Sequence, residues 1–139
     1  MKTLDILTQY DSITFLACND IRHTLSVLNN MGIDISAIDY DPKFKDQEFY
    51  INKDFIFDDI KYSSELVVHM NCEKTYPEIR HCGDVLLRGD NLNYHGDCNP
   101  VYSTNQLIEQ FNLKDVYQEH VVEGEDITCK NLYLVWGRM

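Results

Sequence analysis

The hydrophobic pattern along the first forty residues predicts a strand, a helix and a second strand. Residues 12–17 (SITFLA) form a short apolar run rich in β-forming residues, which is typical of a buried strand. Residues 21–32 place apolar side chains three and four positions apart, the spacing of an amphipathic helix, with Asn19 or Asp20 before it as a cap. Residues 33–39 alternate apolar with small or polar side chains, so we expect a second strand there.

The rest of the chain continues this alternation and then ends on two strands. The further elements that the pattern predicts are a short strand at 48–51, a short helix or turn at 57–62, strands at 64–71 and 83–91, a helix at 103–112 that begins at a Ser/Thr cap, and strands at 116–124 and 130–138. The short segment 126–129 between the last two strands lacks helical character, which predicts an antiparallel hairpin.

The order of these elements predicts the fold class. Strands that alternate with helices imply a parallel sheet with right-handed crossovers, and the final pair of strands adds an antiparallel one. We therefore expect one α/β domain spanning residues 1–139, a three-layer sandwich whose mostly parallel sheet is closed by a C-terminal antiparallel β-hairpin.

Composition and charge narrow the class of protein. Hydrophobic residues make up 44% of the 139 residues and charged residues 25%, a mix typical of a folded globular domain. No apolar run of about 18 residues occurs, which predicts no membrane span, and the first residues lack the apolar stretch of a secretory signal. The net charge is −11 and the basic residues are scattered, which disfavours a nucleic acid as partner.

The five cysteines predict reduced thiols and a cytoplasmic location, because their number is odd and no signal peptide is recognised. A zinc site is an alternative, since HMNC at 69–72, HGDC at 95–98 and the pair His81–Cys82 supply the ligand types of a tetrahedral centre. However, the first of these segments falls on a predicted buried strand, where neighbouring side chains point to opposite faces. The prediction is therefore that no metal is bound.

The order of elements resembles that of the class I S-adenosylmethionine-dependent methyltransferases, whose Rossmann-like sheet ends in such a hairpin. SITFLACND is similar to the first strand and cofactor turn of that family, AIDYD to its second strand and terminal acid, and NKDFIFDD to the segment near the adenine amine. ELVVHMNCEKTYP is similar to the fourth strand and the segment that faces the methyl donor and acceptor, and GDVLLRGDN to the fifth strand. The pairing of CEK..YP with RGDN also resembles small methyltransferase-like proteins of bacteriophages.

This resemblance implies a set of contacts to S-adenosylmethionine. Asp39 matches the acid that holds the ribose hydroxyls, and Asp54 matches the acid beside the adenine amine. Asn71 lies at the end of the fourth strand, on the edge that meets the cofactor. The turn that replaces the family's Gly-x-Gly-type loop consists of Ala17, Cys18, Asn19 and Asp20. The alternative is a solvated loop acid at Asp39, and Asp58 and Asp59 compete for the role of Asp54.

The resemblance also implies where the chemistry takes place. Transfer of a methyl group from a sulfonium is an in-line displacement, in which a protein aligns the partners and removes a proton where needed. His69 or Glu73 is the candidate base. The residues expected on the acceptor side are Cys72, Tyr76, Asn91 and Asn93. The alternative is that His69 and Cys72 belong to the core and that the two asparagines form a polar turn.

The sequence departs from the family at two places. The cofactor turn has no glycine, although Asn19 adopts a left-handed backbone more readily than most residues and Ala17 is small. No helical segment that would cover a substrate is expected before the first strand. Two functions therefore stay open: a methyltransferase that acts on a small molecule or a protein, and a non-catalytic interaction module or inhibitor of a basic host protein. Self-association into a homo-oligomer, and the host cytoplasm as the location of a phage protein, are further expectations.

Overall fold

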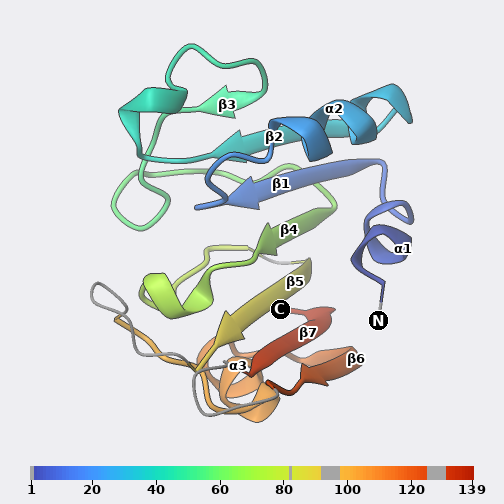
Figure 1. The fold of residues 1–139 in the computed structure, drawn as a ribbon, viewed down its shortest axis with the longest axis vertical. Coiled ribbons are helices and arrows are strands. Elements are labelled where there is room, and N and C mark those ends of the chain that lie inside the picture. Colours follow the sequence, from blue (N-terminus) through green and yellow to red (C-terminus); the bar gives the residue numbers. More distant parts are fainter. Residues whose placement is uncertain (1, 82, 92–97, 125–130) are drawn as a thin grey trace.

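One mixed β-sheet organises the part of the chain that the structure describes. The computed structural model describes residues 2–81, 83–91, 98–124 and 131–139. Within these ranges seven strands form a sheet in the order β3-β2-β1-β4-β5-β7-β6 (Figure 1). The elements, in chain order, are α1 (Thr3–Leu7), β1 (Ser12–Leu16), α2 (Arg22–Asn30), β2 (Asp34–Ile38), η1 (Pro42–Phe44), β3 (Tyr50–Ile51), β4 (Leu66–His69), η2 (Cys72–Lys74), β5 (Asp84–Asp90), α3 (Thr104–Gln110), β6 (Asp115–Val122) and β7 (Leu132–Arg138).

The pairing of the strands confirms the predicted fold class. Strands β1 to β5 pair in parallel, and β7 runs antiparallel to both β5 and β6. Strands β1 and β4 are neighbours in the sheet although they are not consecutive in the chain, so the strand order reverses between them. In open sheets of this kind, ligands bind beyond the carboxyl ends of the strands at that point.

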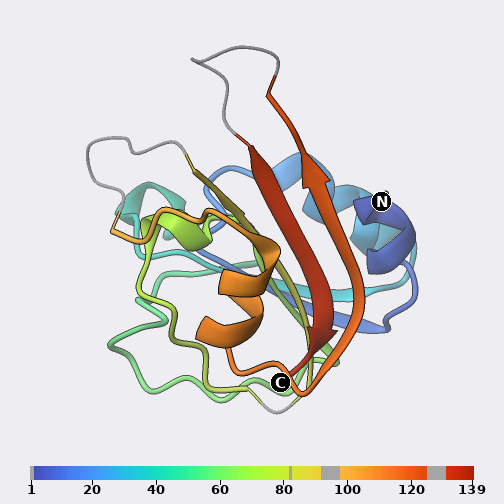
Figure 2. The ribbon, with the colours of Figure 1, turned by 90° about the horizontal axis from the view of Figure 1, so that it is seen from below.

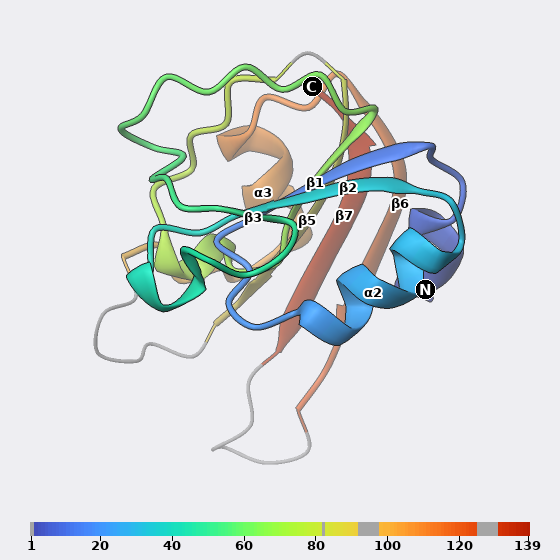
Figure 3. The same ribbon diagram turned by 90° about the horizontal axis from the view of Figure 1, so that it is seen from above.

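Helices cover both faces of the sheet, as the three-layer prediction requires. Helices α1 and α2 lie on one face and α3 on the other (Figures 2 and 3). Successive residues of β1 point to opposite faces, so Phe15 packs with Leu25 and Leu28 of α2, whereas Leu16 packs in the cluster that contains Leu107 of α3. The apolar runs of the central strands are therefore buried on both sides.

Helix α2 ends where the sequence predicts and begins differently. Gly32 follows the helix with φ of +83°, the left-handed conformation that stops helices. The N-cap residue is Ile21 instead of Asn19 or Asp20, and the Asp20 carboxylate accepts hydrogen bonds from the guanidinium and the backbone N–H of Arg22. With nine residues, α2 is the longest helix in the described ranges, and none of these helices has the length and apolar character that crossing a lipid bilayer requires.

One segment corrects the sequence-based expectations, one agrees with them in part, and a third cannot be compared. For the predicted short helix or turn at 57–62 the structure has the turn: it covers residues 55–57, and the rest of the connection between β3 and β4 packs irregularly against the sheet through Phe55, Ile60 and Tyr62. Helix α1 precedes β1, where no helical segment is expected, and it forms because Ile6 and Leu7 are buried against the sheet. The predicted hairpin loop at 126–129 lies outside the described residues.

Tyr10, in the segment between α1 and β1, connects this segment to strands β5 and β7. Its hydroxyl donates to the Asp84 carboxylate at 2.6 Å and accepts from the indole N–H of Trp136 at 2.8 Å. Burial and the neighbouring Asp84 carboxylate raise the pKa of Tyr10. Strands β5 and β7 thereby hold the N-terminal segment in place.

Replacing Tyr10→Phe is expected to destabilise the fold by about 1–3 kcal/mol, because the Trp136 indole and the Asp84 carboxylate would each lose a partner. Urea unfolding followed by the fluorescence of Trp136, the one tryptophan of the chain, measures this change. Tyr102→Phe is the matched control, because Tyr102 is 62% exposed and we expect a change within about 0.5 kcal/mol. Equal stabilities of the two variants would contradict the proposed anchoring role of Tyr10.

Candidate functional site

The turn after β1 adopts the backbone of a glycine-containing loop without containing glycine. Ala17 has φ of +46° and Asn19 has φ of +53°, so both occupy the left-handed region two residues apart. For residues that carry a Cβ this conformation costs roughly 1–2 kcal/mol, and asparagine tolerates it better than most. The turn therefore has the backbone geometry of a Gly-x-Gly loop at the two positions where the glycines would stand.

Hydrogen bonds from three strands hold this turn in its conformation. The N–H of Ala17 donates to the carbonyl of Ile38 at 2.9 Å, and the side-chain amide of Asn71, just after β4, donates to the carbonyl of Ala17 at 2.7 Å. The N–H of Asn19 donates to the Asp39 carboxylate at 2.9 Å. The Tyr50 hydroxyl donates to the carbonyl of Asn19. Each strained residue is thus fixed by partners on neighbouring strands.

The buried Asp39 carboxylate holds the turn through backbone hydrogen bonds. Asp39 is 4% exposed, and its two carboxylate oxygens accept the backbone N–H groups of Asn19 and Asp41, each at 2.9 Å. Asp39 does not line the pocket described next. The structure therefore gives Asp39 a positioning role, and each of its oxygens keeps one further lone pair for another donor.

A pocket with a cavity volume of about 210 Å³ opens at the carboxyl ends of β1, β2 and β4. The turn contributes Ala17, the end of β2 contributes Ile38 and Tyr40, and the segment after β4 contributes Thr75 and Tyr76. The remaining lining residues are Lys53, Asp54, Phe55, Ile56, Phe57, Lys74 and Cys98. The pocket thus lies at the edge where ligands bind in open α/β sheets. We call it the aromatic pocket.

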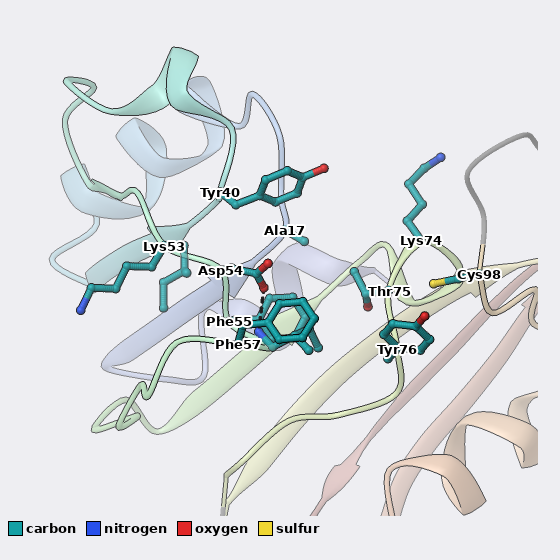
Figure 4. A pocket seen from close by; sticks show the side chains of 12 residues that line it. Ala17, Tyr40, Lys53, Asp54, Phe55, Phe57, Lys74, Thr75, Tyr76 and Cys98 are labelled. Carbon is teal, nitrogen blue, oxygen red and sulfur yellow. Dashed lines mark hydrogen bonds between the residues drawn. The ribbon is translucent and has the colours of Figure 1, made fainter.

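Aromatic side chains dominate this pocket. Tyr40, Phe57 and Tyr76 are 70%, 81% and 61% exposed, an unusual degree of exposure for three aromatic residues around one hollow. Figure 4 shows Tyr40 beside Ala17, with Asp54 between Tyr40 and the two phenylalanines, and Lys53 pointing away from them. Flat apolar faces around a few polar groups are suited to a planar, heteroaromatic ligand.

Asp54 is the acidic side chain that lines this pocket. Its Oδ1 accepts the N–H of Ile56 at 2.9 Å, and its own N–H donates to the Asp58 carboxylate at 2.8 Å. These two bonds fold the connection back on itself, and Asp54 remains at the pocket wall. The sequence leaves Asp54, Asp58 and Asp59 as competitors, and the structure places only Asp54 among the lining residues.

The two candidate bases are buried. His69 is fully buried, its Nε2 lies 2.7 Å from the Thr75 hydroxyl, and its ring contacts Phe55 edge-on. Burial lowers the pKa of His69 to about 4, with a smaller opposing contribution from the backbone of Leu16, so the ring is neutral at neutral pH. Glu73 is 3% exposed, and neither residue lines the aromatic pocket. His69 therefore reaches the pocket wall through two lining residues, the hydroxyl of Thr75 and the ring of Phe55.

The remaining predicted residues fall at several places. Cys18, Asn19 and Asn71 line a second cavity on the opposite face, Tyr76 lines the aromatic pocket, and Asp20 is exposed beside Arg22. Burial and the nearby Asp39 charge raise the pKa of Cys18 to about 12. Cys72 is fully buried, and burial raises its pKa. Asn91 exchanges hydrogen bonds with Asn131 next to the end of β7, and Asn93 lies outside the described residues.

Metal binding finds little support in the described part of the chain. No group of three or more His, Cys, Asp or Glu side chains converges there in a way that could hold an ion. His69 and Cys72 are both buried, and Cys72 Sγ donates to the backbone carbonyl of His69 at 3.4 Å. Cys82 and His95, the other members of the zinc alternative, lie outside the described residues.

Several solved structures of methyltransferases have a fold similar to that of this chain. The solved structure of 1,6-didemethyltoxoflavin-N1-methyltransferase from Burkholderia thailandensis, with bound 1,6-didemethyltoxoflavin and S-adenosylhomocysteine, matches 97% of this chain and 74% of its own at a TM-score of 0.66 and 9% identity. The N-methyltransferase NodS from Bradyrhizobium japonicum in complex with S-adenosylhomocysteine matches 97% of this chain and 86% of its own at a TM-score of 0.63 and 10% identity. The apo form of the S-adenosylmethionine-dependent methyltransferase SibL matches 98% of this chain and 52% of its own at a TM-score of 0.67 and 9% identity.

The fold is that of the class I S-adenosylmethionine-dependent methyltransferases. No protein-family model and no curated protein sequence matches the chain. Because the identities to these structures are 9–10%, the likeness concerns the fold, and the site has to be argued from the residues of this chain.

Sequence reasoning missed most of the aromatic residues around the pocket. Tyr40 directly follows Asp39 and Phe55 directly follows Asp54, so both lie beside an acid that the sequence already singles out, whereas Phe57 lies three residues after Asp54. An aromatic residue placed immediately after a strand that ends at the switch point is the signal that could have found Tyr40. The two phenylalanines gave no such signal, because only the tertiary structure brings the connection after β3 to this edge.

The left-handed turn predicts that Ala17→Gly stabilises the protein by about 1 kcal/mol, because glycine removes the Cβ strain at a positive φ. Ala37→Gly is the matched control, since Ala37 is fully buried in β2 and the same change there is expected to destabilise by about 1 kcal/mol or more. Urea unfolding measures both free energies. A loss of stability in Ala17→Gly would show that the residue is not strained.

Buried His69 predicts a loss of stability on mild acidification. The unfolded chain binds a proton at this residue near pH 6.5 and the folded chain only near about 4, so the free energy of unfolding falls as the pH drops between these values. The slope from His69 is at most about 1.4 kcal/mol per pH unit. His81, whose pKa burial also lowers, adds a contribution of the same sign.

Urea unfolding between about pH 4 and 8 tests this prediction. His69→Gln, which can keep a hydrogen bond to Thr75, is expected to flatten the acidic slope. The exposed His23 provides the control His23→Gln, which should leave it unchanged. Parallel slopes for the wild type and His69→Gln would show that His69 is not a buried neutral residue.

Proposed function

We propose that this protein binds S-adenosylmethionine, with the adenine in the aromatic pocket, and transfers its methyl group to a small molecule or a protein. The observation that supports this most is the turn after β1. Ala17 and Asn19 both have a positive φ, and the turn borders the aromatic pocket at the switch point of the sheet. A strained backbone persists only where its surroundings enforce it, and such strain concentrates at ligand sites.

The aromatic pocket has the chemistry that an adenine ring requires. Tyr40 and Phe57 offer exposed ring faces on which a base can stack, and each such contact is worth about 1–3 kcal/mol. The Asp54 carboxylate is an acceptor for the exocyclic amine of adenine. In this arrangement Asp39 keeps the turn in place, and a ribose hydroxyl would use the lone pairs that its two backbone bonds leave over.

The buried groups limit the chemistry that the chain itself performs. S-adenosylmethionine supplies an electrophilic methyl group, which an acceptor atom takes up in one in-line displacement. His69 is neutral but enclosed, and Glu73 is also buried, so neither lies at the pocket surface to remove a proton. The contribution of the protein is therefore alignment of the two partners. This arrangement suits an acceptor that is nucleophilic without help from a base.

A second candidate function is binding without catalysis, as an interaction module or an inhibitor of a basic protein. The engaged Asp39 carboxylate and the two buried candidate bases favour it, and the net charge of −11 is suited to a basic partner. The same charge disfavours a nucleic acid substrate. The resemblance to bacteriophage proteins and the cytoplasmic location stay predictions from the sequence. So does self-association, for which the exposed edge strand β6 offers a pairing surface.

Isothermal titration calorimetry with S-adenosylmethionine and S-adenosylhomocysteine tests the proposal. The wild type is expected to bind both, and Phe57→Ala and Tyr40→Ala should each weaken binding roughly 5- to 100-fold through the lost stacking. Tyr102→Ala is the matched control, because Tyr102 is also largely exposed, at 62%, but lines no part of the aromatic pocket. Wild-type protein that releases no heat with either ligand would rule out the cofactor.

A methyl-transfer assay then separates the two candidate functions. Production of S-adenosylhomocysteine in the presence of an acceptor indicates a methyltransferase. Binding of both ligands without turnover across a panel of thiols, amines and acids indicates the non-catalytic alternative.

A further inference from the structure

A second cavity lies on the face of the sheet opposite to α3. Its volume is about 440 Å³, within the range of cavities that hold small molecules. Leu7 of α1 and Ile21, at the start of α2, form two of its walls, and Phe15 and Val68 of the sheet form its floor. These side chains give the cavity an apolar body. We call it the Arg88 cavity, after the one cation among its lining residues in the described part of the chain.

Arg88 is half-buried and forms no ion pair with another residue that the structure describes. Its Nε donates to the carbonyl of Met70 at 3.2 Å, which fixes the guanidinium above the end of β4. Among the described residues no ion pair includes Arg88, although the chain carries 23 acidic residues. The carbonyl of Met70 compensates only part of the solvation that such a guanidinium loses when it is partly removed from water. Such a group beside a cavity is suited to an anionic ligand that enters it.

The Arg88 cavity and the aromatic pocket meet at the same turn. Ala17 lines the aromatic pocket, whereas Cys18 and Asn19 line the Arg88 cavity. Asn71, whose amide donates to the carbonyl of Ala17, also lines the Arg88 cavity. A ligand that extends from the aromatic pocket past Ala17 would therefore have its far end at the mouth of the Arg88 cavity. A second molecule that reacts with the far end of this ligand has to lie at the mouth of the Arg88 cavity.

We propose that the Arg88 cavity binds the methyl acceptor, and that this acceptor is a small organic acid with a separate amine, whose carboxylate pairs with Arg88 while its apolar body lies over Phe15 and Val68. The amine nitrogen would bond to the methyl carbon as the methyl–sulfur bond breaks, S-adenosylhomocysteine would leave, and the proton of the amine would pass to solvent. The inference rests on the proposed function, because it assigns the acceptor to a site next to the cofactor. Planar carboxylate and planar guanidinium form two parallel hydrogen bonds, and the terminal nitrogens of Arg88 supply the donors for them. Asn19, Asn71 and Thr24 add polar groups at the rim.

Nuclear magnetic resonance titration of the full chain tests the site directly. The probes are hexanoate and benzoate, and hexanamide and benzamide are their uncharged controls. The two acids are expected to shift the backbone amides of residues 18–19 and 70–71 and the side-chain Nε–H of Arg88, and the two amides should do so far less. Equal shifts from acids and amides, or shifts confined to other residues, would overturn the proposal.

The variant Arg88→Met keeps an unbranched apolar stem and removes the guanidinium with its charge. We expect it to weaken hexanoate binding about tenfold or more, because a charge-assisted pair is lost. Arg22→Met is the matched control, since Arg22 lies outside the cavity and pairs with Asp20. If Arg88→Met does not fold, Arg88→Lys keeps the charge without the planar fork and should still weaken binding. Unchanged hexanoate affinity in a folded Arg88 variant contradicts the assignment.

A carboxylate on Arg88 could also belong to the amino-acid end of S-adenosylmethionine, and a competition experiment distinguishes the two sources. The acceptor assignment predicts that hexanoate binds equally well with S-adenosylhomocysteine present, and that Arg88→Met binds S-adenosylhomocysteine normally. If hexanoate competes, and Arg88→Met weakens S-adenosylhomocysteine but not 5′-methylthioadenosine, the carboxylate is that of the cofactor and the acceptor assignment is wrong. Hexanoate binding without any binding of S-adenosylhomocysteine would instead overturn the proposed function and leave an acid-binding site.

Discussion

The hydrogen bonds that hold Ala17 and Asn19 in a left-handed backbone are the constraint on which the site depends. Asp39 of the second strand, Asn71 after the fourth strand and the carbonyl of Ile38 each contribute one of them. Without these partners the two residues would relax toward ordinary backbone angles, since a Cβ makes the left-handed region unfavourable. The turn would then move, and the walls that Ala17 and Asn19 contribute to the two cavities would move with it.

This arrangement assigns a structural task to residues that the sequence suggests for binding. The Asp39 carboxylate fixes two backbone amides, and the Asn71 amide fixes a carbonyl, where glycines would have needed no such support. His69 similarly holds Thr75 and packs against Phe55, two residues of the pocket wall. The polar groups at the ends of the strands therefore preorganise a pocket whose ligand-facing surface is largely aromatic.

The two faces of the sheet give the two cavities different chemistry. The aromatic pocket combines exposed rings with Asp54, whereas the Arg88 cavity combines apolar walls with one guanidinium. The chain has a net charge of −11, yet none of the ion pairs among the described residues includes the half-buried Arg88. Selectivity for an anion in such a chain has to come from a local, shielded site, because the overall field repels it.

The sequence by itself determined the kinds of elements, their order and the class of fold, because the periods of apolar residues and the glycine after α2 are local signals. It also indicated that the turn at 17–20 is where a cofactor loop would lie, and that Asn19 tolerates the required backbone. Only the tertiary structure decided which side chains face a cavity. Asp39, His69 and Glu73 stand at strand ends in the sequence, yet neighbouring strands and loops bury them, whereas Phe57 and Arg88 line cavities together with residues far away in the chain. Burial and partner choice depend on which strands become neighbours, and that information is not contained in the spacing along one segment.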